Sequence, residues 1–169
     1  ALHDFTSAIQ HAPHDSTHYR NRADLYFKLD NLDAARDDYD RAIQLKPNEA
    51  RYYFNRSMFH THRNDYALAI ADITSAITLA PRDEYHLYRG FMHVEVQEFE
   101  NAEADFNEAF RVTKNLSQTH ARLASFYDHR GEYDKALKAA EEALRIDSSN
   151  SLAKRIHERL VGLAQGSGK

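Results

Sequence analysis

The chain has 169 residues, with 22 Lys and Arg against 26 Asp and Glu, a formal net charge of −4 and no cysteine. The lack of cysteine excludes disulfides, thiol nucleophiles and cysteine-ligated zinc, and the balanced charge disfavours nucleic acid and anionic membranes as partners. Mean hydropathy is −0.74, no apolar run approaches the roughly 18 residues of a membrane span, and the N-terminus lacks a signal-peptide pattern. We therefore expect no membrane segment, and a cytoplasmic location by default.

A period of 34 residues runs through the chain. The three prolines, Pro13, Pro47 and Pro81, are spaced by 34 and 34. Two series of alanines step by 34, 34, 33 and 34 in the same frame: Ala1, Ala35, Ala69, Ala102 and Ala136, and Ala8, Ala42, Ala76, Ala109 and Ala143. A fixed period of this length is typical of repeat proteins, in which each unit buries its apolar face against the next.

Each period is predicted to hold two helices. In chain order, the first helices are expected near residues 16–29, 50–62, 84–96 and 117–129. The second helices are expected near residues 33–46, 66–79, 100–113 and 134–146. Short polar turns such as Asp30-Asn31, Asn64-Asp65 and Gly131-Glu132 separate the two helices of a unit.

The resulting organisation has a partial unit at one end and a single helix at the other. Residues 1–13 are predicted to be the second helix of an incomplete leading repeat, and residues 165–169 a disordered tail. Four complete units and a C-terminal capping helix are predicted between them, at residues 16–49, 50–82, 83–116, 117–150 and 151–164. The incomplete first unit indicates either a fragment of a longer array or a surface available for self-association.

The recurring alanines alternate with bulky side chains at helical spacing. Phe5, Tyr39, Ile73 and Phe106 each lie between two alanines of the series. Small residues opposite large ones let two antiparallel helices approach closely. The sequence therefore predicts an all-α chain of antiparallel helix pairs.

The segments from Gly131 to Asp147 and from Tyr66 to Pro81 resemble the tetratricopeptide repeat, or TPR, and the resemblance extends over nearly the whole chain. It departs from the family pattern where Tyr or His replaces the usual Trp, and where Lys114 and Ser148 replace the proline that ends a unit. The resemblance implies a right-handed superhelical solenoid whose first helices line a concave groove. It also implies a non-catalytic scaffold or adaptor that binds a peptide or a helical segment of a partner protein.

Arginine and aspartate recur as a pair in three units. Arg22, Arg56 and Arg89 are each followed 16 residues later by Asp38, Asp72 and Asp105, whereas the fourth unit has Leu123 and Ala139 at both positions. Because the two charges are present or absent together, we predict a bidentate contact between the two helices of a unit. The alternative is that both side chains are solvated.

Eleven histidines raise the question of a metal site. His60, His93, His86 and His120 occupy positions where sister units carry Tyr, which indicates packing. His60 and His62 lie about 200° apart on a helix and cannot share an ion. No phosphate loop, nucleophile elbow or zinc-protease helix is present in the sequence. We therefore expect no metal, no cofactor and no enzyme activity.

The groove residues are assigned by the resemblance. An apolar floor flanked by arginines would suit a segment with a bulky apolar residue and a nearby acidic group, and Asn21 and Asn55 resemble asparagines that hold a partner's backbone. The assigned residues are Arg20, Asn21, Asp24, Phe27, Arg51, Phe54, Asn55, Met58, Leu87, Tyr88, Phe91 and Arg122. The competing interpretation of such an aromatic stripe is that it belongs to the core.

Three alternatives remain open at the level of sequence. A co-chaperone module that grips a C-terminal carboxylate matches at Asn55, but Asp24, Glu84 and Tyr88 stand where that clamp needs Asn, Lys and Arg. The other two alternatives are a self-association module and the non-catalytic arm of a larger enzyme. In each case the expected partner is a protein or a peptide.

Overall fold

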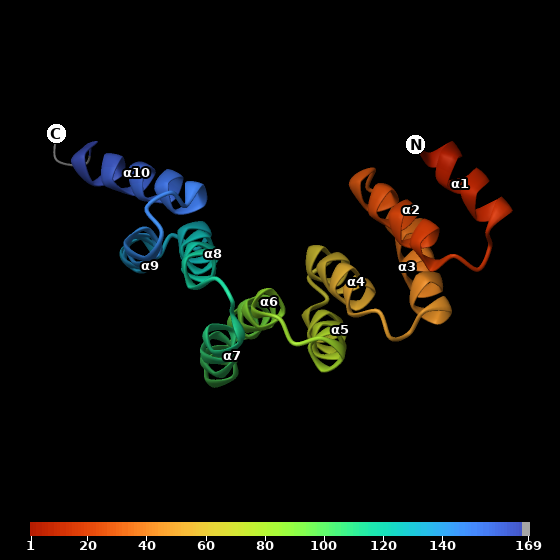
Figure 1. The fold of residues 1–169 in the computed structure, drawn as a ribbon, viewed down its shortest axis with the longest axis horizontal. Coiled ribbons are helices and arrows are strands. Elements are labelled where there is room, and N and C mark those ends of the chain that lie inside the picture. Colours follow the sequence, from red (N-terminus) through yellow and green to blue (C-terminus); the bar gives the residue numbers. More distant parts are fainter. Residues whose placement is uncertain (167–169) are drawn as a thin grey trace. The chain divides into compact units, whose positions relative to one another are not determined.

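All of the regular secondary structure in the described part of the chain is helical. The structure, a computed structural model, describes the backbone of residues 1–166 and the side chains of residues 1–163, and this part contains ten helices and no strand (Figure 1). The prediction of an all-α fold built from helix pairs is confirmed. The helices are α1 (Leu2–His11), α2 (Ser16–Lys28), α3 (Leu32–Leu45), α4 (Ala50–His62), α5 (Tyr66–Leu79), α6 (Asp83–Glu95), α7 (Phe99–Val112), α8 (Leu116–His129), α9 (Tyr133–Ile146) and α10 (Ser151–Gly166).

The helix boundaries lie within two residues of the predicted ones. Two ends differ by two residues: α1 ends at His11 rather than at residue 13, and α10 continues to Gly166 rather than ending at residue 164. The predicted disordered tail therefore begins too early, because residues 165 and 166 are helical. Its remaining residues, 167–169, lie outside the described part of the chain.

The chain divides into two compact units, which we describe separately. Unit 1 comprises Ala1–Pro81 and Tyr88–Ala102, and unit 2 comprises Arg82–Leu87 and the chain from Glu103 onwards. In unit 1, α2 packs against α3, α4 packs against α5, and α1 packs on α2 (Figure 1). Helix α1 has no fully buried residue.

Alanines allow the helices of unit 1 to approach each other. Ala23 of α2 and Ala35 of α3 are both 0% exposed and form one cluster with Tyr39 and Phe59. The rings of Tyr39 and Phe59 lie with their centroids 6.0 Å apart. A methyl group at each close contact leaves room for a ring from the neighbouring helix, as the alternation of small and large residues predicts.

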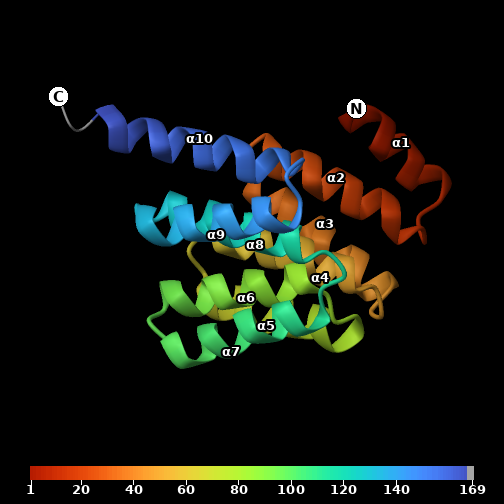
Figure 2. The same ribbon diagram turned by 60° about the vertical axis from the view of Figure 1, so that its left-hand side comes forward.

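Helix α10 closes the apolar surface of unit 2. It packs against α8 and α9 (Figure 2), and its Ile156 and Leu160 are each 5% exposed, in a cluster with Ala136 and Ala140. The opposite side of α10 carries exposed charged residues. This amphipathic pattern is typical of a helix that covers the end of a repeat array.

The predicted contact between arginine and aspartate is present in the first two complete repeats, residues 16–49 and 50–82. The Arg22 guanidinium donates to both carboxylate oxygens of Asp38, at 2.7 and 2.8 Å, and Arg56 donates to those of Asp72 at 2.8 and 2.7 Å. The aspartate side chains are both 8% exposed. Each bidentate pair joins the two helices of its repeat, and it would be broken if one helix slid along the other, so it favours the correct helix register. The pairing raises the pKa of Arg56, mainly because Asp72 accepts its hydrogen bonds.

Candidate functional site

Most of the predicted groove residues of unit 1 line one cavity. The cavity has a volume of about 410 Å³ and lies between side chains of α2, α3 and α4. It includes seven predicted residues, together with Lys28, which the resemblance also places on the groove-facing side of the first repeat, and Tyr39, which was not selected. The seven are Arg20, Asp24, Phe27, Arg51, Phe54, Asn55 and Met58.

Asp24 is the electrostatic centre of this groove. Its carboxylate accepts hydrogen bonds from Arg20 at 2.8 Å, Tyr39 at 2.8 Å and Asn55 at 3.1 Å. The donors come from one turn earlier on α2, from α3 and from α4, so this carboxylate links three helices. Burial is the main reason that the pKa of Tyr39 is raised, and the neighbouring Asp24 raises it further. Tyr39 therefore remains protonated and donates to Asp24.

The cationic side chains of the groove outnumber its single carboxylate. Arg20 neutralises Asp24, while Lys28 and Arg51 are exposed and form no ion pair within the described residues. The Nε of Arg20 is buried without a hydrogen-bond partner. The exposed Lys28 and Arg51 therefore give the groove an excess of positive charge, which favours an anionic group on a ligand.

The apolar surface of the groove comes from one residue on α2 and two on α4. Phe27 packs edge to face against Phe59 and His62, with centroid distances of 6.0 and 5.1 Å. Met58 is 42% exposed. Phe54 packs edge to face against Tyr88 of α6, with centroids 5.4 Å apart. Rings held by their neighbours form a firm surface, and the flexible thioether of Met58 can adapt to a ligand.

The structure changes the interpretation of the two asparagines. The amide nitrogen of Asn55 already donates to the carboxylate of Asp24, so this side chain is partly occupied by a contact within the groove. Asn21 is half-buried and does not line the cavity. The two residues therefore do not present equivalent groups at the cavity.

Three further predicted residues differ in position from the expectation. Leu87 is 1% exposed, so its assignment to an open groove floor is wrong, and it belongs to the core. Tyr88 and Phe91 are half-buried and lie outside the residues that line the cavity. Burial raises the pKa of Tyr88. Apolar residues on one helix face serve either core or groove, and the repeat period does not distinguish the two.

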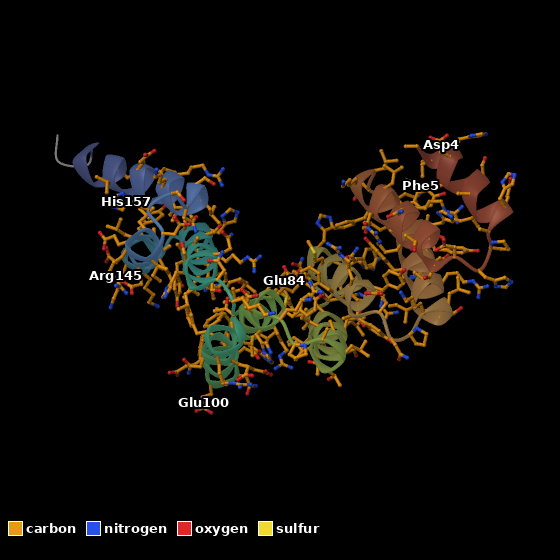
Figure 3. All side chains as sticks on the ribbon, in the orientation of Figure 1. Asp4, Phe5, Glu84, Glu100, Arg145 and His157 are labelled. Carbon is orange, nitrogen blue, oxygen red and sulfur yellow. The ribbon has the colours of Figure 1, made fainter. Side chains whose placement is uncertain are left out.

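Arg122 belongs to unit 2 and contacts acidic residues of its own unit. Its guanidinium lies 3.4 Å from Asp83 and 3.5 Å from Glu84, the residue labelled in Figure 3. The same Asp83 carboxylate accepts a hydrogen bond from the buried Thr119 at 3.0 Å. The predicted role of Arg122 in a ligand groove therefore competes with a role in joining α6 to α8.

The histidines serve as packing and pairing residues. His86 lies 3.4 Å from Asp105, and His93 lies 2.7 Å from Glu98. Burial lowers the pKa of His60, although the carboxylate of Asp72 at 3.6 Å opposes this effect. Within residues 1–163, no group of three or more His, Cys, Asp or Glu has a geometry suited to a metal ion. None of the described helices combines the length and the apolar character needed to span a membrane.

The architecture defines a helical-repeat protein built from stacked helix pairs. A tetratricopeptide repeat model matches residues 1–50 and 21–84, and a second such model matches residues 117–150. The chain belongs to the tetratricopeptide repeat family. Such repeats generally mediate protein-protein interactions, and proteins built from them are typically non-catalytic scaffolds.

Solved structures support the same fold. TTC0263, a tetratricopeptide repeat protein of Thermus thermophilus, superposes with a TM-score of 0.73 at 20% identity, covering 95% of this chain and 88% of that one. PilW, a type IV pilus biogenesis factor, superposes with a TM-score of 0.70 at 21% identity, covering 95% of this chain and 77% of PilW. YrrB, described as having an unusual peptide-binding site, superposes with a TM-score of 0.65 at 19% identity, covering 98% of this chain and 86% of YrrB. No curated protein sequence matches the chain.

Proposed function

We propose that the chain is an adaptor that holds an extended or helical segment of a partner protein in the groove between α2 and α4. The segment would carry a bulky apolar side chain and, beside it, an acidic group. The observation that carries this proposal is the cavity of about 410 Å³ that combines Phe27, Phe54 and Met58 with two cations that form no ion pair among the described residues. An apolar anchor with a charged neighbour is the usual combination at a protein-binding hot spot.

The internal bonds of Asp24 remove an obstacle to an acidic ligand. An unpaired carboxylate in the groove would repel a second carboxylate, but Asp24 is neutralised by Arg20 and accepts bonds from Tyr39 and Asn55. A ligand carboxylate would instead meet Arg51 and Lys28 at the exposed side of the groove. Complementary charge of this kind increases both association rate and specificity.

The structural relative YrrB supports a peptide as the ligand class, since it is described as having a peptide-binding site. The clamp for a C-terminal carboxylate receives no such support. Glu84, at the position where that clamp needs a cation, already lies 3.5 Å from Arg122. We therefore assign the ligand as an internal segment of a partner rather than its terminus.

A displayed library of random peptides, selected on the wild-type chain, tests this proposal. We expect the selected peptides to share a bulky apolar residue next to Asp or Glu. Their affinity should fall about tenfold or more when Arg51→Glu and Met58→Glu are introduced together, because both the charge and the apolar contact are lost.

The matched control is Leu68→Glu. Leu68 is 54% exposed on α5 and does not line the groove, so this substitution changes an exposed apolar residue to the same charge without affecting the site. The proposal fails if the selected peptides bind the groove variant and the control equally well. It also fails if amidation of the peptide terminus abolishes binding, because that result identifies a terminal clamp.

A further inference from the structure

In the first two complete repeats, the arginine of each Arg–Asp pair fills the space between three helices. Besides its bond to Asp38, Arg22 donates to Thr6 of α1 at 3.2 Å. Arg56 likewise bonds both Asp72 and Asp40 of α3, the latter at 2.5 Å. Each guanidinium therefore occupies the junction between the two helices of its repeat and the second helix of the preceding repeat.

The corresponding junction of the fourth repeat is hollow. Leu123 occupies the arginine position and Ala139 the aspartate position. Both residues line a cavity of about 320 Å³ among α7, α8 and α9. A leucine is shorter than an arginine, and an alanine lacks a carboxylate. These two side chains therefore leave open the space that the ion pair fills in the first two complete repeats.

The walls of this cavity are mainly apolar and aromatic. Phe110 of α7 and His120 of α8 pack with their ring centroids 4.6 Å apart, and Tyr127 lines the same space. Burial lowers the pKa of His120, so its ring is predominantly neutral at pH 7. An open apolar hollow of this kind gains free energy when an apolar side chain replaces the water in it.

Among the described residues, the rim of the cavity carries one positive charge without an ion-pair partner. Lys138 is exposed and has no hydrogen-bond or ion-pair partner among the described residues. The charge of Lys135 is balanced by Glu132 at 2.6 Å. Glu142 is bonded by Arg145, labelled on α9 in Figure 3, at 3.0 and 2.6 Å. An anionic group next to an apolar one therefore complements this site.

We propose that this cavity is a second docking site, which takes a single bulky apolar side chain of a partner protein segment that has a carboxylate next to it. Its volume of about 320 Å³ lies at the lower end of the roughly 300–1,000 Å³ range of small-molecule sites. One anchored side chain suits this volume, with the carboxylate at Lys138. The site is separate from the groove between α2 and α4, and it does not depend on the function proposed for that groove.

N-acetylphenylalanine is a minimal probe for this site, because it joins an aromatic side chain to a carboxylate. We expect titration of the wild-type chain to produce saturable amide chemical-shift changes at residues 119–127 and 135–142, with an affinity of about 1 mM for so small a ligand. N-acetylphenylalaninamide, which lacks the charge, should bind about threefold or more weakly. Lys138→Glu should weaken binding of the acid similarly, and Lys154→Glu on α10 should not.

The decisive variant rebuilds the missing ion pair. Leu123→Arg with Ala139→Asp reproduces the residues of the first two units, so the variant should fold with unchanged helical circular dichroism and lose the saturable shifts. The groove between α2 and α4 should keep its peptide affinity in this variant. The proposal is overturned if the wild type shows no saturable shifts at these residues, if the rebuilt variant binds as the wild type does, or if the acid and the amide bind equally.

Discussion

At the scale of the residue, the Arg–Asp pairs show how one repeat position can fix the helix register in some repeats and leave a cavity in another. Asp72 is only 8% exposed and accepts two bonds from Arg56. Removing the arginine alone would leave a largely buried carboxylate without its main partner. Removing both charges would leave the apolar arrangement that Leu123 and Ala139 already form in the fourth unit.

We expect Arg56→Leu to lower the free energy of unfolding by about 3 kcal/mol, because the carboxylate of Asp72 stays buried without its guanidinium. Adding Asp72→Ala should recover most of this loss, to within about 1 kcal/mol of the wild type. Urea denaturation of the single and double variants measures both effects. A double variant less stable than Arg56→Leu would contradict the interpretation that the pair serves register more than stability.

At the scale of the element, the turn inside each unit requires a left-handed residue. Asp30, Asn64, Gln97 and Gly131 have φ of 59°, 60°, 63° and 73° and recur at steps of 34, 33 and 34. After each of them, the next backbone N–H bonds a carbonyl in the last turn of the first helix, as from Glu132 to Tyr127 at 2.9 Å. Gln97 was not predicted because glutamine is not a typical turn residue, although the 33-residue step from Asn64 would have located it.

Two glycine substitutions should have opposite effects. Gly131→Ala should destabilise unit 2 by about 1 kcal/mol, because a β-carbon disfavours positive φ. No atom lies within 4 Å of that β-carbon, so the effect is one of backbone conformation alone. Gly162→Ala, within α10 and equally unobstructed, should stabilise by about 0.5–1 kcal/mol because alanine favours helix. Thermal denaturation compares the two, and a shift of the same sign in both would refute this account.

At the scale of the whole molecule, the packing contacts join helices that are close in sequence. In unit 2, α8 packs on α9 and both pack on α10. In unit 1, the corresponding contacts join α1 to α5 in succession. Stability in such an array is approximately a sum of terms from each repeat and from neighbouring repeats, so damage to one end should remain largely local.

Leu160→Ala tests this locality. Leu160 is 5% exposed in the cluster that joins α10 to α9, and its truncation should destabilise unit 2 by about 2–4 kcal/mol through the cavity that it leaves. Amide hydrogen exchange should accelerate in α8, α9 and α10, while α2, α3 and α4 keep their protection. An equal loss of protection in α2 to α4 would show that the chain unfolds as one cooperative body.

The sequence by itself determined the helices, the two residues of each bidentate pair, and seven of the residues that line the cavity of unit 1. The helices and the pairs depend on spacing along one helix or on a period of 34 residues, and the groove residues follow from the resemblance to the repeat family, so all of them can be named without coordinates. The tertiary structure alone decided that Asp24 is shared by Arg20, Tyr39 and Asn55, and that Leu87 is buried. It alone also decided that Leu123 and Ala139 leave a cavity. Each of these outcomes depends on side chains from two or three helices meeting at one point, and the repeat period does not specify which side chains fill the space between them.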